Sequence, residues 1–256
     1  FNDTATTEIY TLSLHDALPI SMIAVAPVFG DEAIPAQAKI ALGLFLSLTF
    51  FPIAAKNAPS LNSQLAQIVV TVFQEATIGL LMGFSANMIF SGAMMAGEFI
   101  SFNMGLGFAH FFDPNLGQSV TVLSRFFYVT SILIFLAING HHFLLESLQL
   151  SYSTVPIGGL SFNESMFDEM MKLSRTIFIV AVKISAPAVV CLFLTNVVLA
   201  ILARVVPQMN VFLVGFPLQV ATGLLVLLVI SPLMVFVFKK LLLDFEENFF
   251  EFVKVI

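Results

Sequence analysis

Three side chains near the middle of the sequence have the residue types and spacing of a metal site. They are His141, His142 and Glu146, in the string NGHHFLLE. In a helix, His142 and Glu146 would share one face, and imidazole and carboxylate groups are common zinc ligands. No HExxH motif or second carboxylate cluster completes the set. We therefore expect no metal here and favour a helix end whose histidines cap the helix or contact a partner.

Other catalytic arrangements are also missing from the sequence. GLG at 105–107 follows no predicted strand and lacks the third glycine of a dinucleotide-binding loop. There is no GxSxG nucleophile elbow. The single cysteine, Cys191, lies in an apolar run and excludes an internal disulfide. We expect a noncatalytic protein without a cofactor.

Five charged residues flank or enter strongly apolar runs. Charged groups inside membrane helices often have a function, such as lining a polar path. Each of these residues also coincides with the end of an apolar run, so we favour helix ends and keep a polar path as the alternative. The residues are Glu75, Glu98, Arg125, Lys183 and Arg204.

The composition defines the class of protein. The 256 residues are 59% hydrophobic and 10% charged, whereas a soluble domain is usually about 45–50% apolar and about 25% charged. This indicates a membrane protein built as a single bundle of helices. The net charge of −6 and the scattered basic residues exclude a nucleic-acid partner.

The gaps between charges predict the helices, because a membrane span needs about 20 mostly apolar residues. We predict an all-α, membrane-associated bundle of about five long, kinked hydrophobic helices, preceded by a truncated first one. The last helix is expected to break near the GFP string and to run to about Phe238. The predicted helices lie within 40–55, 76–97, 126–145, 184–203 and 205–238, and the stub is MIAVAPVF at 22–29.

Three local patterns refine this outline. Residues 61–75 have helical amphipathic spacing, so they are expected to lengthen the helix that follows. Small residues in 76–97 favour close contact between helices. The hydrophilic connector 153–172 contains a Pro-Gly turn, and the next helix is expected to start at Asn163 or Ser165.

The segment GEFISFNMGLGFAHFFDPNLGQSVTVLSRF at 97–126 is apolar, yet its glycines and DPN turn make an unbroken helix unfavourable. Non-helical backbone at membrane depth is tolerated only where protein buries it or where it lines a cavity. Phe108, Phe111, Phe112 and Met104 form a bulky, adaptable set that can close a passage. The alternative is a re-entrant loop that packs against its neighbours and has no gating role.

Three strings together resemble the FliR family of the bacterial flagellar type III export gate. They are MGLGFAHFFDP, INGHHFLLESLQLSYSTVPIGG and RVVPQMNVFLVGFPL, and the resemblance covers about 22–256. The NGH and TVPIGG strings favour the flagellar family over its injectisome counterpart. An independent secondary transporter is the remaining alternative, but the sequence shows no repeated halves and no central acidic residue.

The resemblance implies a role and two sets of residues. FliR-like proteins form, with FliP-like and FliQ-like subunits, an inner-membrane channel for unfolded flagellar proteins in the basal body, beside FlhB-like and FlhA-like components. His110 departs from the family pattern. The implied plug comprises Met104, Gly105, Leu106, Gly107, Phe108, Ala109, Phe111, Phe112, Asp113 and Pro114. The implied subunit-packing hairpin includes Pro207, Gln208, Asn210, Gly215, Phe216 and Pro217.

The first residues, FNDTATTEIYTLSLHDALPIS, differ in character from the rest. They have no basic start and no continuous apolar core, so they do not form a signal peptide. Residues 2–20 read as the in-frame translation of a common sequencing-adapter oligonucleotide. We expect residues 1–21 to be non-native, and 22–256 to be a single export-gate domain that lacks its native N-terminus.

Overall fold

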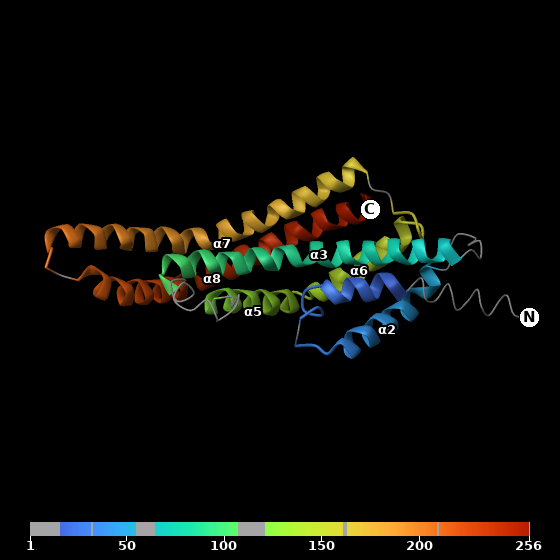
Figure 1. The fold of residues 1–256 in the computed structure, drawn as a ribbon, viewed down its shortest axis with the longest axis horizontal. Coiled ribbons are helices and arrows are strands. Elements are labelled where there is room, and N and C mark those ends of the chain that lie inside the picture. Colours follow the sequence, from blue (N-terminus) through green and yellow to red (C-terminus); the bar gives the residue numbers. More distant parts are fainter. Residues whose placement is uncertain are drawn as a thin grey trace, which may run out of the picture. The chain divides into compact units, whose positions relative to one another are not determined.

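The computed structural model describes residues 16–31, 33–54, 65–106, 121–160, 163–208 and 210–255. Every regular element in these ranges is a helix, which confirms the predicted all-α class (Figure 1). A short helix, Asp16–Val25, comes first. The others are α2 (Ala36–Ala54), α3 (Leu65–Asn103), α5 (Val122–Ala137), α6 (Gly140–Thr154), α7 (Glu164–Val205) and α8 (Val211–Val255).

The number of helices that could cross a membrane agrees with the prediction. The helices α2, α3, α7 and α8 are each long and apolar enough to cross a membrane, and α5 with α6 makes a fifth candidate, bent by 72°. At about 1.5 Å per residue, α3, α7 and α8 measure roughly 60 to 70 Å, about twice the hydrocarbon core of a bilayer. They are too long to lie wholly within that core at ordinary tilts.

Two predicted helix boundaries are wrong. The helix α8 continues through Gly215, Pro217 and Pro232, so there is no break at GFP. Apolar helices tolerate such prolines, because neighbouring groups satisfy the carbonyl that loses its backbone partner. The chain turns earlier, before α8, where the Leu213 N–H donates to Asn210 Oδ1 at 3.3 Å. The helix predicted at 126–145 is the bent α5–α6 pair, with Asn139 in the left-handed conformation (φ 61°).

The first helix also differs from the predicted stub at 22–29. It covers Asp16–Val25, so residues 16–21 contribute more than half of it. Leu18 is buried. Residues 16–21, which are predicted to be non-native, are thus part of the first helix, so this helix begins before the predicted domain start at residue 22. The non-native origin of residues 1–21 stays a prediction.

The chain divides into two compact units, and three long helices contribute to both. The first unit contains the described residues up to Met88, together with Ile138–Ser174 and the residues from Phe245 onward. Its core is aromatic: the rings of Phe143 and Phe249 lie 4.9 Å apart. Phe50 of α2 and Tyr152 of α6 lie 6.4 Å apart and join these two helices.

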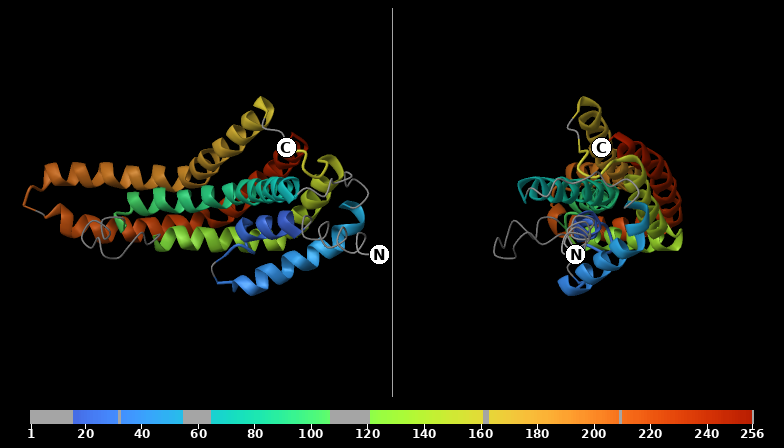
Figure 2. Two further views of the ribbon diagram at one scale, coloured as in Figure 1. Left: turned by 45° about the vertical axis from the view of Figure 1, so that its right-hand side comes forward. Right: turned by 90° about the vertical axis from the view of Figure 1, so that its right-hand side faces the viewer.

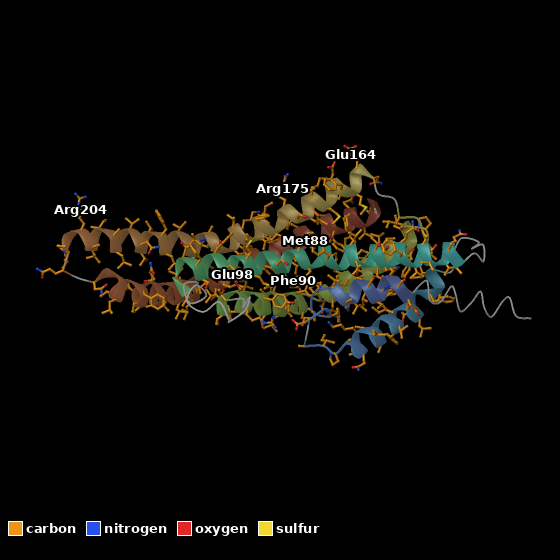
Figure 3. All side chains as sticks on the ribbon, in the orientation of Figure 1. Met88, Phe90, Glu98, Glu164, Arg175 and Arg204 are labelled. Carbon is orange, nitrogen blue, oxygen red and sulfur yellow. The ribbon has the colours of Figure 1, made fainter. Side chains whose placement is uncertain are left out.

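The second unit contains Ile89–Ala137 and Arg175–Asp244. Its core centres on Phe90, which is labelled in Figure 3 and lies 5.3 Å from the ring of Phe135 and 6.4 Å from that of Phe238. In this unit α7 and α8 lie side by side as a hairpin (Figures 1 and 2). We call residues 175–244 the α7–α8 hairpin.

Small residues allow close helix contact, as predicted. At Gly97 of α3, an added Cβ would lie 2.6 Å from the Cα of Ser124 in α5. No side chain fits in that distance, so glycine at this position lets the two backbones meet.

The start of α3 is amphipathic as predicted, but two of its polar side chains lie on the buried side. Thr71 and Glu75 are buried, with Glu75 only 3% exposed, whereas Val69, Val70 and Phe73 are exposed. Apolar side chains are also exposed along the α7–α8 hairpin, including Phe193 and Leu228. Apolar surface of this extent is suited to lipid or to partner subunits rather than to water.

Candidate functional site

The implied plug can be examined through the residues on either side of it. Met104, Gly105 and Leu106 are described, and they directly follow the last residue of α3. The remaining implied residues lie outside the described part of the chain: Gly107, Phe108, Ala109, Phe111, Phe112, Asp113 and Pro114. We call Met104–Gly105 the upstream flank, and Thr121–Ser124, which begins α5, the downstream flank.

The upstream flank ends α3 through backbone geometry. The Met104 N–H donates to the Ile100 carbonyl at 2.9 Å, and the Gly105 N–H donates to the Phe102 carbonyl at 3.1 Å. Gly105 has φ 79°, a left-handed conformation that glycine adopts at little cost. Glycine at 105 therefore lets the chain leave the helix at this point.

The upstream flank rests on one face of α8. Met104 is completely buried, and a Cβ added at Gly223 would lie 2.6 Å from its Cγ, Sδ and Cε atoms. A Cβ added at Gly105 would lie 3.3 Å from the Phe216 ring and 3.4 Å from Gln219 Oε1. Phe216, Gln219 and Gly223 recur at helical spacing on α8. Phe216 thus joins the implied plug and the implied hairpin, which the sequence suggested separately.

The same face of α8 is tied to α7. The Gln219 side-chain amide donates to Asn196 Oδ1 of α7. One turn away, a Cβ added at Gly215 would meet Leu199 of α7 at 3.4 Å, an ordinary contact. The other implied hairpin residues have local roles: Pro207 and Gln208 lie in the turn, Asn210 caps α8, and Pro217 lies inside α8.

The downstream flank is held by a carboxylate from α3. Glu98 Oε1 accepts hydrogen bonds from the Thr121 N–H (3.2 Å), the Thr121 hydroxyl (3.3 Å) and the Ser124 hydroxyl (2.7 Å). Figure 3 labels Glu98 on this part of α3. Thr121 also caps α5, because its Oγ1 accepts from the Ser124 N–H at 3.3 Å. A carboxylate at the start of a helix is further favoured by the helix dipole.

The comparison with known proteins assigns the family. The model of the bacterial export proteins, family 1, matches residues 19–245. The chain belongs to this family. It is 35% identical over 206 residues to flagellar biosynthetic protein FliR of Bacillus subtilis (strain 168), covering 79% of each chain. It is 34% identical over 214 residues to FliR of Pectobacterium carotovorum subsp. carotovorum, covering 84% of this chain and 81% of the relative.

FliR of Escherichia coli (strain K12) is 30% identical over 215 residues, covering 84% of this chain and 81% of the relative. The resemblance to the FliR family is thereby confirmed. Together with the apolar helices, it makes this export-family chain a membrane component of flagellar protein export.

The charged residues of this export-family chain fall into two groups. Arg204, labelled in Figure 3, lies in the last turn of α7. Arg125 lies in the first turn of α5, and both positions agree with the helix-end interpretation. Glu75 and Glu98 both lie within α3, about ten residues after its start and about five before its end, so that interpretation is wrong for them. Lys183 is exposed in the interior of α7, where the helix-end interpretation also fails.

Glu75 and Glu98 have similar structural roles. Each carboxylate binds the backbone of a distant turn. Glu75 Oε1 accepts a hydrogen bond from the Gly158 N–H at 2.9 Å, and Glu98 accepts one from the N–H of Thr121. Burying part of a carboxylate is costly unless it is hydrogen-bonded. Each of the two glutamates therefore holds a distant turn of the chain against α3.

The histidine cluster lies at a helix start, as expected. The helix α6 begins at Gly140, which places His141 and His142 in its first turn, with their rings 4.4 Å apart. Within the described ranges, no three His, Cys, Asp or Glu side chains are close enough together to hold a metal ion.

Sequence reasoning missed several residues that form this site: Thr121, Ser124, Asn196, Gln219 and Gly223. Thr121 carried a usable signal, because Thr directly before an apolar run is a preferred residue at the start of a helix. Gly223 and Gln219 lie in an apolar run, and their partners are far away in the sequence. Only the fold identifies them.

Proposed function

We propose that this chain is a noncatalytic subunit of the flagellar type III protein export gate. In this role it assembles with FliP-like and FliQ-like subunits into a channel that passes unfolded flagellar proteins. The channel lies in the inner membrane at the flagellar basal body, beside FlhA-like and FlhB-like components. The driving force is supplied elsewhere in the apparatus.

The main observation behind the proposal is that both flanks of the implied plug are held in place by neighbouring helices. Met104 and Gly105 are packed on α8, and Thr121 is bonded to Glu98 of α3, within one compact unit. Phe108, Phe111 and Phe112, between two fixed flanks, have the bulk needed to block a passage.

The exposed apolar faces support assembly with other subunits. Phe193 and Leu228 of the α7–α8 hairpin are 61% and 77% exposed. The long helices exceed a bilayer core, so part of such a surface needs a cover other than lipid tails. Neighbouring subunits supply that cover in the proposed channel.

Co-expression with the FliP-like and FliQ-like subunits encoded in the same genome tests the assembly. We expect the three chains to purify together in a detergent-stable complex, and this chain to aggregate when it is expressed alone. A homo-oligomer that forms without those subunits and transports solutes in liposomes would contradict the proposal and favour an independent transporter.

The plug is tested by replacing residues 105–112 with a Gly/Ser linker of equal length. We expect the assembled channel to leak ions, because the bulky side chains are lost. The matched control replaces residues 56–63, which are eight residues between α2 and α3. Unchanged ion conductance of the assembled 105–112 variant would show that this loop does not seal the channel.

A further inference from the structure

We propose that Arg175, Lys239 and Lys240 bind the phosphate groups of anionic phospholipids, at the level where the α7–α8 hairpin leaves the apolar core of the membrane. These three residues are called the basic collar below. The inference concerns the hairpin of this chain and does not depend on the proposed gate function.

The basic collar lies at one level along the helices of the second unit, because α7 and α8 pack there on neighbouring turns of α3. A Cβ added at Gly92 of α3 would lie 2.9 Å from the carbonyl oxygen of Ile177, two residues after the collar arginine. The ring of Phe238, next to the collar lysines, lies 6.4 Å from that of Phe90 on α3. Phe90 and Gly92 are only about 3 Å apart along the helix axis. The arginine of α7, labelled with Phe90 in Figure 3, and the lysines of α8 therefore lie at nearly the same position along the hairpin.

The exposed surface changes character at the basic collar. Toward the hairpin turn it is apolar: Phe178 of α7 and Phe236 of α8 are 59% and 66% exposed, each within about one helical turn of the collar. Residues 205–238 include no charged residue. Beyond the collar, the exposed residues of α8 other than Leu243 are charged or polar. They are Asp244, Glu247, Asn248, Glu251 and Lys254. This change is expected where a helix passes from hydrocarbon to the membrane surface.

The positive charges of the collar are not neutralised within the chain. In the part of the chain that the structure describes, ion pairs join other residues, such as Lys172 and Glu169, and none involves the collar. Residues 86–97 of α3 and 126–137 of α5, around the contact between Phe90 and Phe135, carry no charge. On α8, Asp244 lies one turn beyond the collar. One acidic residue against three cations leaves this level positively charged.

An anionic phospholipid has the same order of groups as this surface, with a negative phosphate next to hydrocarbon. Lysine and arginine can lay their stems along apolar surface and keep their charged ends at the headgroups. An acidic protein surface would match the charges but not the exposed phenylalanines beside them. The exposed Lys183, two turns further along α7, adds to the same level, because side chains in a helix lean toward its N-terminus.

Native mass spectrometry tests the inference on the chain purified in detergent, with the subunits that accompany it. Phosphatidylglycerol is compared with phosphatidylcholine of the same acyl chains. We expect the wild type to prefer phosphatidylglycerol. Each cation removed should lower the affinity for this lipid about fivefold, so Lys239→Gln with Lys240→Gln should lower it about 25-fold. The affinity for phosphatidylcholine should not change.

Two further variants separate charge from general disruption. Lys239→Arg with Lys240→Arg keeps both charges and should retain the affinity for phosphatidylglycerol. Lys172→Gln with Lys254→Gln is the matched control. It removes the same number of charges from exposed lysines that already pair with Glu169 and Glu251, so the affinity should remain that of the wild type.

Four results would overturn the inference. The first is equal affinity of the wild type for the two lipids, and the second is unchanged phosphatidylglycerol affinity in Lys239→Gln with Lys240→Gln. The third is inorganic phosphate that displaces phosphatidylglycerol at equal concentration, because the collar would then be a site for free anions. The fourth is loss of the accompanying subunits from the glutamine variant with its lipid preference unchanged, which would assign the collar to a subunit interface.

Discussion

The Ser124 hydroxyl donates to Glu98 Oε1 at 2.7 Å, which joins the C-terminal part of α3 to the first turn of α5 across 26 residues of sequence. Close to this bond, Gly97 lets the α3 backbone approach Ser124. The start of α5, which follows the implied plug, is therefore held against α3 by two features: the Glu98 carboxylate accepts its hydrogen bonds, and Gly97 has no side chain to keep the helices apart.

Replacing Glu98 should weaken this junction. Glu98→Ala leaves the Thr121 N–H without its acceptor, at a cost of about 1–3 kcal/mol. The two hydroxyls keep other acceptors, because Ser124 can donate to the Met94 carbonyl at 3.0 Å and Thr121 to Ser124 Oγ at 3.1 Å. Glu98→Gln keeps an acceptor oxygen and should lose less. The measurement is thermal unfolding of the co-purified complex in detergent. An alanine variant as stable as the wild type would show that the bonds contribute nothing.

The turn after α6 gives a second prediction. Gly158 has φ 73°, and its N–H donates to buried Glu75 at 2.9 Å. Gly158→Ala should destabilise the first unit by about 1–2 kcal/mol, the cost of a left-handed residue with a Cβ. Gly158→Asn should cost less, because asparagine tolerates this conformation better. Limited proteolysis of connector 155–163 provides the measurement, and equal cleavage rates in all three proteins would contradict the assignment.

The number and type of helices could be predicted from the sequence, because long apolar runs between charges have few other structures available to them. Their boundaries could not. Glu75 and Glu98 coincide with the ends of apolar runs, but their partners are 83 and 23 residues away, so nothing local shows that they lie inside one helix. The GFP string predicts a helix break only if proline acts there as it does in the helices of water-soluble proteins.

The site was only partly predictable for the same reason. The glycines and phenylalanines of the plug segment are visible in the sequence, whereas Gly223 resembles any small residue in an apolar helix. The start of α3 shows a further limit. Its amphipathic pattern is clear, but Phe73 is 72% exposed and Glu75 is 3% exposed. Spacing alone does not say which face is inward once lipid or protein replaces water.

The helix cap at Asn163 gives a third prediction. Asn163 Oδ1 accepts a hydrogen bond from the Met166 N–H at 2.7 Å, which confirms one of the two predicted starts of α7. Asn163→Ala should destabilise this end of α7 by about 1 kcal/mol, whereas Asn163→Asp keeps the acceptor. Hydrogen exchange at residues 164–168 measures the effect. Unchanged exchange in the alanine variant would contradict the capping role.

The proposed origin of residues 1–21 predicts a genomic result. Long-read resequencing of the locus should show other codons before the one for Met22, because residues 2–20 read as translated adapter sequence. Finding the same codons in the chromosome would refute the proposal. In that case the helix Asp16–Val25 and buried Leu18 would be native parts of the first unit.

Two phenylalanines of the second unit separate folding from assembly. Phe90 is buried between Phe135 and Phe238, so Phe90→Ala should cost about 3–5 kcal/mol and lower the melting temperature of the purified complex. Phe193 is exposed on α7. Phe193→Ala should leave the unfolding of this chain almost unchanged but reduce the amount of FliP-like and FliQ-like subunits that purify with it. Equal losses of stability in the two variants would mean that Phe193 belongs to the core of this chain. If Phe193→Ala co-purifies with the other subunits as well as the wild type does, the subunit interface lies elsewhere.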